Sequence, residues 1–250
     1  MSVKHWGSGP ETALLLHCTL AQGGAWGPMA RHLRDRFTMI APDLLSHGNG
    51  PTHDASRDFH EQATAEAATH LPQTPTHLIG HSFGATIALR LALDHPARVK
   101  SLTLIEPVLF CAATGPGRAA HDALTADIPS HLAYGDKSAA ARIFLSLWGA
   151  EPFDAMAPAL QSYVTDRIWI PAACEPALTS DTANLLPRLS RLQTPTLLLQ
   201  GDRSPPVIAE ILTRLAKDIP HARRQIIPNA AHMAPLTHPQ ATAAAISRAL

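Results

Sequence analysis

The sequence predicts an α/β fold, in which a mostly parallel sheet of about seven strands is flanked by helices and carries an inserted helical cap. Short runs of leucine and β-branched residues alternate with alanine-rich stretches of helical length along most of the chain. The runs contain few polar residues, which is typical of strands that are covered on both faces. One long interval interrupts this alternation, because residues 109–194 contain helical segments and no convincing strand.

The expected elements alternate between strand and helix, the order that builds a parallel sheet. Leucine triplets mark the first strand and the strand that begins at Thr196, and an alanine- and leucine-rich stretch marks the clearest helix, 84–94. The strands are expected at about 12–18, 37–43, 76–80, 100–106, 196–200 and 223–227, and the helices near 25–35, 59–70, 84–94, 207–217 and 239–250.

The long interval predicts the domain organisation. Residues 1–108 and 195–250 are expected to form the α/β core, and residues 109–194 to form a helical cap. Roughly 85 residues far exceed the dozen or so that an ordinary crossover connection needs. Ligands of open α/β sheets bind at the carboxyl ends of the strands, so the cap should shape the pocket there. An unrelated small helical domain is the alternative interpretation.

The composition limits the kinds of partner that the protein can bind. Of the 250 residues, twenty are basic and twenty acidic, so the chain lacks the field that gathers phosphates. We therefore expect a small-molecule acyl substrate and no nucleic acid; the oligomeric state stays open. No apolar run has the length of a signal peptide or a membrane span, which predicts a soluble, cytoplasmic protein with no membrane partner.

Cysteine and histidine usage predicts neither disulfides nor a metal site. The three cysteines, Cys18, Cys111 and Cys174, are far apart and form no CxxC pair. The fifteen histidines are scattered and include no HExxH motif, so we expect neither a metal nor another cofactor.

The segment Gly80-His81-Ser82-Phe83-Gly84 is the strongest functional signal. It follows an apolar strand directly and opens a helix, which is the context that the G-x-S-x-G motif requires. The two glycines permit a tight turn that lifts the serine hydroxyl out of the sheet, and the helix N-terminus beneath it favours negative charge. This segment resembles the nucleophile elbow of the α/β-hydrolase superfamily. A serine that merely caps the helix is the alternative.

The resemblance extends to the C-terminus. In the superfamily the base lies in a loop after the last strand, and here Ala230-Ala231-His232-Met233 occupies that place, with Ala231 where glycine is usual. Serine needs a base, and imidazole has a suitable pKa near neutrality. The resemblance also implies that the usual first antiparallel strand is missing, because only about eleven residues precede the first central strand. Roughly seven strands then remain instead of eight.

The oxyanion hole is expected from two backbone N–H groups. Leu16-His17-Cys18-Thr19 resembles the His-Gly-X segment whose X residue lends one N–H, which assigns Thr19, and Phe83 after the nucleophile lends the other. Cys18 replaces the usual glycine, so Leu20 stays an alternative donor. Cys18 itself has no adjacent base motif and is expected to be a packed thiol.

The triad acid has two candidates. The superfamily often places it in a Gly-x-x-Asp segment, but here Gly201 is followed three residues later by Ser204, and Asp202 comes two positions early. Other members place the acid after the strand that follows the elbow helix, where this chain has Glu106. We assign the acid to Glu106, to fix the tautomer of His232, with Asp202 as the alternative.

These residues predict a serine hydrolase that cleaves a small carboxylic ester through an acyl-enzyme on Ser82. Lactone, thioester, amide or carbon–carbon bond hydrolysis uses the same triad and stays open. A receptor that binds a ligand without turnover, and a cofactor-free lyase that uses His232 as a base, are rivals from other classes.

Overall fold

The computed structural model describes residues 2–249 and contains one seven-stranded sheet. Its strand order is β1-β3-β2-β4-β5-β6-β7, and every neighbouring pair is parallel except β1 with β3. The predicted fold class and strand count are thereby confirmed. The strands are β1 Val3–Trp6, β2 Glu11–Leu16, β3 Phe37–Pro42, β4 Thr76–His81, β5 Val99–Ile105, β6 Thr196–Gly201 and β7 Ala222–Ile227.

The expectation that no antiparallel strand precedes the first central strand is wrong. Residues Val3–Trp6 pair antiparallel with β3, from Val3 opposite Pro42 to Trp6 opposite Met39. The segment is only four residues long and includes the polar Lys4 and His5, so its sequence carries no strand signal. Pairing with the edge of the sheet, rather than burial of both faces, holds it in place.

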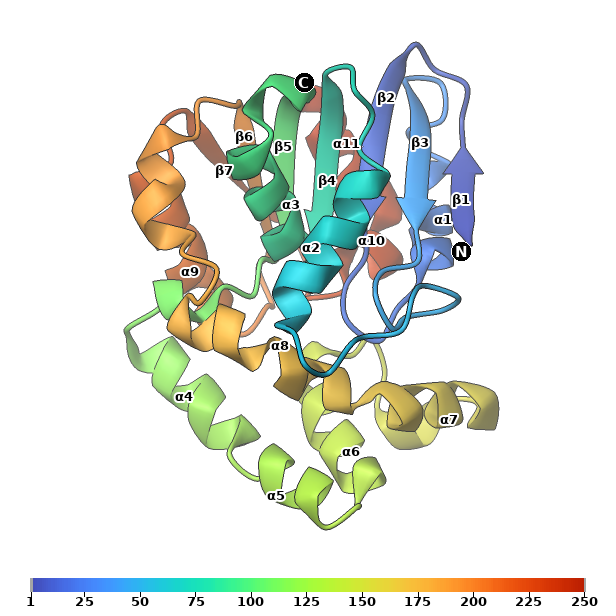
Figure 1. Cartoon of the computed structure of the whole chain (residues 1–250), viewed down its shortest axis with the longest axis vertical. Helices are drawn as coiled ribbons and strands as arrows, with labels where there is room; N and C mark the ends of the chain where they lie inside the picture. Colours follow the sequence, from blue (N-terminus) through green and yellow to red (C-terminus); the bar gives the residue numbers. More distant parts are fainter. Residues whose placement is uncertain (1, 250) are drawn as a thin grey trace.

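Helices cover both faces of the sheet (Figure 1). One face carries α2 (Phe59–Thr69), α3 (Phe83–Asp94) and α9 (Pro206–Asp218), and the other carries α1 (Gly27–Ala30), α10 (Ala234–Thr237) and α11 (Pro239–Ala249). Each helical layer buries its own apolar cluster against the strands, with Phe83 and Ile211 in the first and Met29 and Ile246 in the second. This is the arrangement expected of a parallel sheet with hydrophobic strands.

The helix expected near 25–35 is much shorter than predicted. A 3₁₀ turn, Gly23–Trp26, leads into α1, which ends at Ala30. Beyond it the N–H groups of His32 and Leu33 bond to carbonyls three residues back, the pattern of 3₁₀ turns. The remaining 3₁₀ segments are Pro96–Arg98, Phe110–Ala112, Phe153–Ala155 and Leu186–Arg191.

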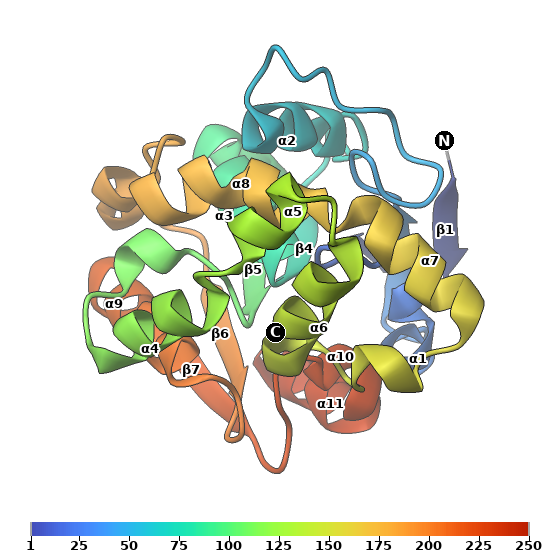
Figure 2. The same cartoon turned by 90° about the horizontal axis from the view of Figure 1, so that it is seen from below.

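Five helices lie between β5 and β6 in sequence: α4 (Pro116–Thr125), α5 (Ile128–Ala133), α6 (Lys137–Trp148), α7 (Pro158–Arg167) and α8 (Trp169–Ser180). We call them the inserted helices. They lie beyond the end of the sheet toward which the arrowhead of β3 points (Figure 1), and Figure 2 shows them in front of the strands. Helices α5, α6 and α7 share an apolar cluster that includes Ile128, Leu145 and Val164, and that reaches Leu20 of the core.

Two buried histidines organise the loops at this end of the sheet. The Nε2 atom of His17 accepts the Leu44 N–H at 3.0 Å, and that of His47 accepts the Leu20 N–H at 3.0 Å. Each ring donates its Nδ1–H to a backbone carbonyl, 2.8 Å away in both cases. An Nε2 that accepts a hydrogen bond must be unprotonated, so both rings are neutral. Burial lowers the pKa of His17 to about 4 and that of His47 to about 3.

These and two further buried histidines should make the fold sensitive to acid. Burial lowers the pKa of His60 to about 4 and that of His81 to about 3, whereas an unfolded chain protonates histidine near pH 6.5. Between these values the unfolded state binds more protons than the folded state. The free energy of unfolding should therefore fall as the pH is lowered from about 6.5 toward 4, by ~1.4 kcal/mol per pH unit for each proton taken up.

Urea unfolding at about pH 7, 6 and 5, at constant ionic strength, measures this slope. His60→Gln should make the slope shallower by about one proton, since His60 contacts only Thr86 and Arg90 through its ring nitrogens. The matched control is His5→Gln, because His5 is exposed. A stability that stays constant or rises on acidification would contradict the assignment of neutral buried rings.

Candidate active site

The candidate residues lie where the parallel strands end. Ser82 follows β4, Glu106 follows β5, the segment 202–204 follows β6, and His232 lies in the loop after β7. Since carboxyl ends of parallel strands share one edge, residues separated by as many as 150 positions meet there. The inserted helices lie at the same edge (Figure 2).

Ser82 has a strained backbone. Its φ of 56° and ψ of −119° place a non-glycine residue in a sparsely populated region, and Ser82 is 4% exposed. Both flanking glycines are required by close packing. A Cβ at Gly80 would lie 2.4 Å from the Gly84 carbonyl oxygen, and a Cβ at Gly84 would lie 2.2 Å from the Leu16 carbonyl oxygen. The strand-to-helix turn thus has the shape that the motif predicts.

The Ser82 backbone is pinned to the neighbouring strand, because its N–H donates to the Ile105 carbonyl at 2.8 Å. Phe83 is the first residue of α3, so its N–H has no acceptor within the helix. The positive end of the helix dipole lies at the same place. A free N–H group and a favourable potential for negative charge therefore adjoin the serine.

Glu106 and His232 form a buried pair. The Nδ1–H of His232 faces Glu106 Oε2 at 3.2 Å, and the two side chains are 3% and 0% exposed. The other carboxylate oxygen, Oε1, accepts the Gly201 N–H and the Ser204 hydroxyl, both at 2.6 Å. A carboxylate buried without partners would be strongly unfavourable, and these three donors satisfy it. With a proton on Nδ1, the Nε2 atom of His232 is left as a hydrogen-bond acceptor.

The structure does not bring Asp202 into this group. Asp202 is exposed, and within residues 2–249 its carboxylate has no hydrogen-bond partner. Its N–H bonds to the Ile227 carbonyl at 3.3 Å, which fixes the backbone at the end of β6. Ser204, which stands where an aspartate is usual, instead donates to Glu106. The two positions therefore cooperate, with the carboxylate supplied by β5 and a hydroxyl by the loop after β6.

The two candidate oxyanion donors after β2 differ in availability. The Leu20 N–H already donates to His47, whereas no hydrogen bond engages the Thr19 N–H within residues 2–249. Leu20 has a φ of 62°, so the chain turns sharply at this point. The hydroxyl of Tyr163, from α7, donates to the Ala21 carbonyl at 2.9 Å and accepts the Gly48 N–H at 3.0 Å. An inserted helix thus holds the loop that carries Thr19.

Cys18 lies beside this loop but is a packed thiol. It is 5% exposed, and burial raises its pKa to about 12. Because the thiolate is the reactive form, such a thiol is a poor nucleophile at neutral pH. Cys111 and Cys174 are also free, and burial raises the pKa of both.

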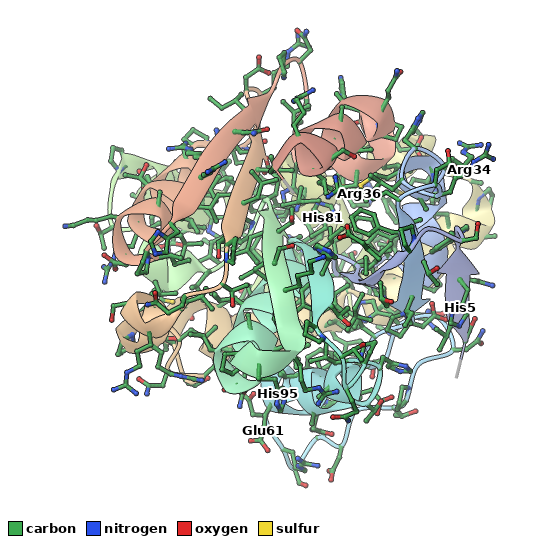
Figure 3. All side chains as sticks on the ribbon, turned by 90° about the horizontal axis from the view of Figure 1, so that it is seen from above. His5, Arg34, Arg36, Glu61, His81 and His95 are labelled. Carbon is green, nitrogen blue, oxygen red and sulfur yellow. The ribbon has the colours of Figure 1, made fainter. Side chains whose placement is uncertain are left out.

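Two residues at the site carried no sequence signal. His81, the residue before Ser82 in the elbow motif, donates its Nε2–H to the His232 carbonyl at 2.9 Å, so it fixes the backbone of that residue. Figure 3 shows His81 in the interior, whereas Arg34, Glu61 and His95 lie at the periphery. Trp148, at the end of α6, packs edge-on against the His232 ring with centroids 4.6 Å apart. Only the fold reveals that these residues meet.

Two cavities adjoin Ser82. The narrow cavity has a volume of about 130 Å³ and is lined by Phe83, Val108 and Phe110, among others. The wide cavity has a volume of about 410 Å³, and its lining includes His232. Four residues line both cavities: Thr19, Ser82, Phe144 and Trp148.

Two features are absent from the described part of the chain. Among residues 2–249, no group of three or more His, Cys, Asp or Glu side chains is placed to hold a metal ion. Over the same range, no helix has both the length and the apolar character that crossing a bilayer requires.

Known proteins resemble this chain over part of its length or over nearly all of it. A pimeloyl-[acyl-carrier protein] methyl ester esterase of Methylococcus capsulatus is 32% identical over 247 residues, 95% of this chain and 93% of that protein. Lipase LipV of Mycobacterium tuberculosis is 33% identical over 111 residues, 44% of this chain and 42% of that protein. The crystal structure of an alpha/beta hydrolase from Sphaerobacter thermophilus superposes with a TM-score of 0.75 at 23% identity, covering 99% of this chain and 95% of that one.

The sequence pattern of one family covers the strands from β2 to β7 and the loops that carry the candidate residues. Residues 13–239 match it, from the middle of β2 to the start of α11. The chain therefore belongs to the alpha/beta hydrolase fold family.

Proposed function

We propose that the protein is an ester hydrolase that forms an acyl-enzyme on Ser82. One observation carries the proposal: the buried Glu106 carboxylate faces Nδ1 of His232 at the sheet edge where a strained serine follows β4. A carboxylate that holds Nδ1 protonated leaves Nε2 free to take a proton from a serine hydroxyl. Ser82 and His232 both line the wide cavity, so a substrate there can meet both.

In the first step, Ser82 Oγ attacks the ester carbonyl carbon while its proton passes to Nε2 of His232. The Oγ–C bond forms, and the carbonyl oxygen becomes negative. The N–H groups of Thr19 and Phe83 hold that oxygen, since neither has another acceptor in the loop or the helix. Glu106 stabilises the imidazolium but keeps its own charge.

In the second step, the imidazolium gives its proton to the alcohol oxygen, and the C–O bond to the alcohol breaks. Water then attacks the acyl-enzyme, and His232 takes a proton from it. Collapse of this second intermediate releases the carboxylic acid and returns the proton to Ser82 Oγ. The net reaction consumes one water and yields one acid and one alcohol.

The relatives support a carboxylic ester as the bond that is cleaved. The Methylococcus relative is named as a methyl ester esterase and the Mycobacterium relative as a lipase, and both names imply this bond. We also propose that residues 109–194 act as a cap, because α4, α6 and α8 contribute walls to the cavities beside Ser82. The cap then selects the substrate, and the core performs the chemistry.

Ser82→Ala should lower kcat/KM for a short activated ester by at least about 10³-fold, because removing the nucleophile abolishes the acyl-enzyme. Reaction of the wild type with an alkyl fluorophosphonate should displace fluoride and add one phosphonyl group to Ser82, detected by peptide mass spectrometry. Unchanged thermal unfolding of the variant is the control for its fold. Retained activity, or a phosphonyl group on another residue, would refute covalent catalysis at Ser82.

Glu106→Gln should lower kcat by several orders of magnitude, because the corresponding aspartate-to-asparagine exchange of the triad acid in a serine protease costs about 10⁴ in kcat. The glutamine can still accept from Gly201 and Ser204 through its oxygen, which turns the NH₂ group toward His232 and favours the wrong tautomer. Asp202→Asn is the matched control, because Asp202 is exposed, and its kcat should change by less than about ten-fold. The opposite ranking would return the acid role to Asp202.

A further inference from the structure

The proposed proton donor lines only one of the two cavities beside Ser82. Both cavities are lined by Ser82 and Thr19, so both reach the nucleophile and one of the two proposed oxyanion donors, whereas the other donor, Phe83, lines the narrow cavity only. His232 lines the wide cavity but not the narrow one. The proposed proton donor, His232, is therefore accessible from the wide cavity only.

The tetrahedral intermediate has three substituents besides Ser82 Oγ: the oxyanion, the acyl group and the alcohol oxygen. The alcohol oxygen must receive a proton from the imidazolium, so it must lie on the His232 side. The acyl group then occupies the narrow cavity. Resting on the proposed function, we propose that the enzyme selects esters of a compact, apolar acyl group with a bulky, apolar alcohol.

The size of the narrow cavity limits the acyl group. Its volume of about 130 Å³ resembles that of an apolar cavity of roughly 150 Å³ that holds one benzene molecule. Val108, Phe110 and Leu178 make its walls apolar. Its lining also includes Asp122 of α4 and Glu175 of α8, both exposed, so an acyl chain long enough to reach the surface would meet a polar rim.

The wide cavity can hold a much larger group. Its volume is about 410 Å³, and Leu145, Met156 and Val164 line it. Leu160 and Leu236 also line it and are 41% and 42% exposed, so apolar side chains continue to the surface. A bulky apolar alcohol would cover this surface, whereas a methyl group would leave most of the cavity filled with water.

The wall between the cavities is fixed by packing. Phe144 and Trp148 line both sides, and the Trp148 ring contacts both His232 and Phe110, with centroids 4.6 and 6.0 Å apart. Trp148 is also 5% exposed. An acyl group that lies in the narrow cavity therefore cannot extend into the wide one without displacing Trp148, whose ring packs against His232.

Two isomeric esters test the proposal. In 4-phenylbutyl acetate the small group is the acyl group, and in methyl 5-phenylpentanoate it is the alcohol; the two share one molecular formula. We expect kcat/KM to be at least about ten-fold higher for the acetate, as expected when several methylene groups lose their pocket. Equal values, or a higher value for the methyl ester, would overturn the assignment of the cavities.

Variants in the cavity walls separate the two sides. Leu160→Trp narrows the wide cavity and should lower kcat/KM for the acetate at least about five-fold more than for the methyl ester. Leu178→Ala enlarges the narrow cavity and should raise the relative rate of the methyl ester. Leu124→Trp is the control, because Leu124 is 58% exposed on α4 and lines neither cavity. Effects in the opposite direction would also overturn the proposal.

Fluorophosphonate labelling of the same preparations distinguishes this inference from the proposed function. If Ser82 is labelled and neither ester is cleaved, or the ranking is reversed, the cavity assignment fails while the nucleophile stands. If Ser82 is not labelled and neither ester is cleaved, the proposed function itself fails, and the inference that rests on it fails too. Because Leu160 lies at the surface, its variant keeps the test valid even if Leu178→Ala unfolds.

Discussion

The contact between the Glu106 carboxylate and Nδ1 of His232 is the constraint on which the rest of the site depends. A fully buried carboxylate is tolerable only when its oxygens are satisfied, and Gly201, Ser204 and His232 supply the donors. The donors lie at the end of β6, in the loop after it, or in the loop after β7. The strand pairings β5 with β6 and β6 with β7 therefore align Glu106 with His232.

The neighbouring loops carry strain that these pairings sustain. Glu106 and Ser82 both have positive φ values, 52° and 56°, and their N–H groups bond to the Leu199 and Ile105 carbonyls at 2.9 and 2.8 Å. These two hydrogen bonds continue the pairing of the sheet one residue past each strand, and they hold the unfavourable backbone conformations in place. His47 holds the positive φ of Leu20 in the same way, by accepting its N–H. The N–H of the neighbouring Thr19 has no acceptor within residues 2–249. The scaffold thus holds the proposed base, the proposed nucleophile and the proposed N–H donors in place before any substrate arrives.

Much of this could be predicted from the sequence. Apolar strand runs and the elbow motif predict the parallel sheet and the serine because both signals are local. The acid is harder to predict. The sequence favours Glu106 because position 204 holds a serine instead of the usual aspartate, and only the fold shows that this Ser204 donates a hydrogen bond to Glu106. The sequence did not predict β1 or the short length of α1, because strand pairing at a sheet edge and the hydrogen bonds of turns leave little trace in composition. The roles of His47, His81 and Trp148 depend on contacts between distant segments, which no single-sequence pattern encodes.

The sharpest test is a crystal structure of the Ser82 phosphonyl adduct, because the adduct mimics the tetrahedral intermediate. We expect a phosphonyl oxygen within about 3 Å of the Thr19 and Phe83 nitrogens, and the second phosphonyl oxygen beside Nε2 of His232. Glu106 should stay bonded to Nδ1. An oxygen directed away from both N–H groups, or a His232 ring that has left Glu106, would contradict the proposed mechanism.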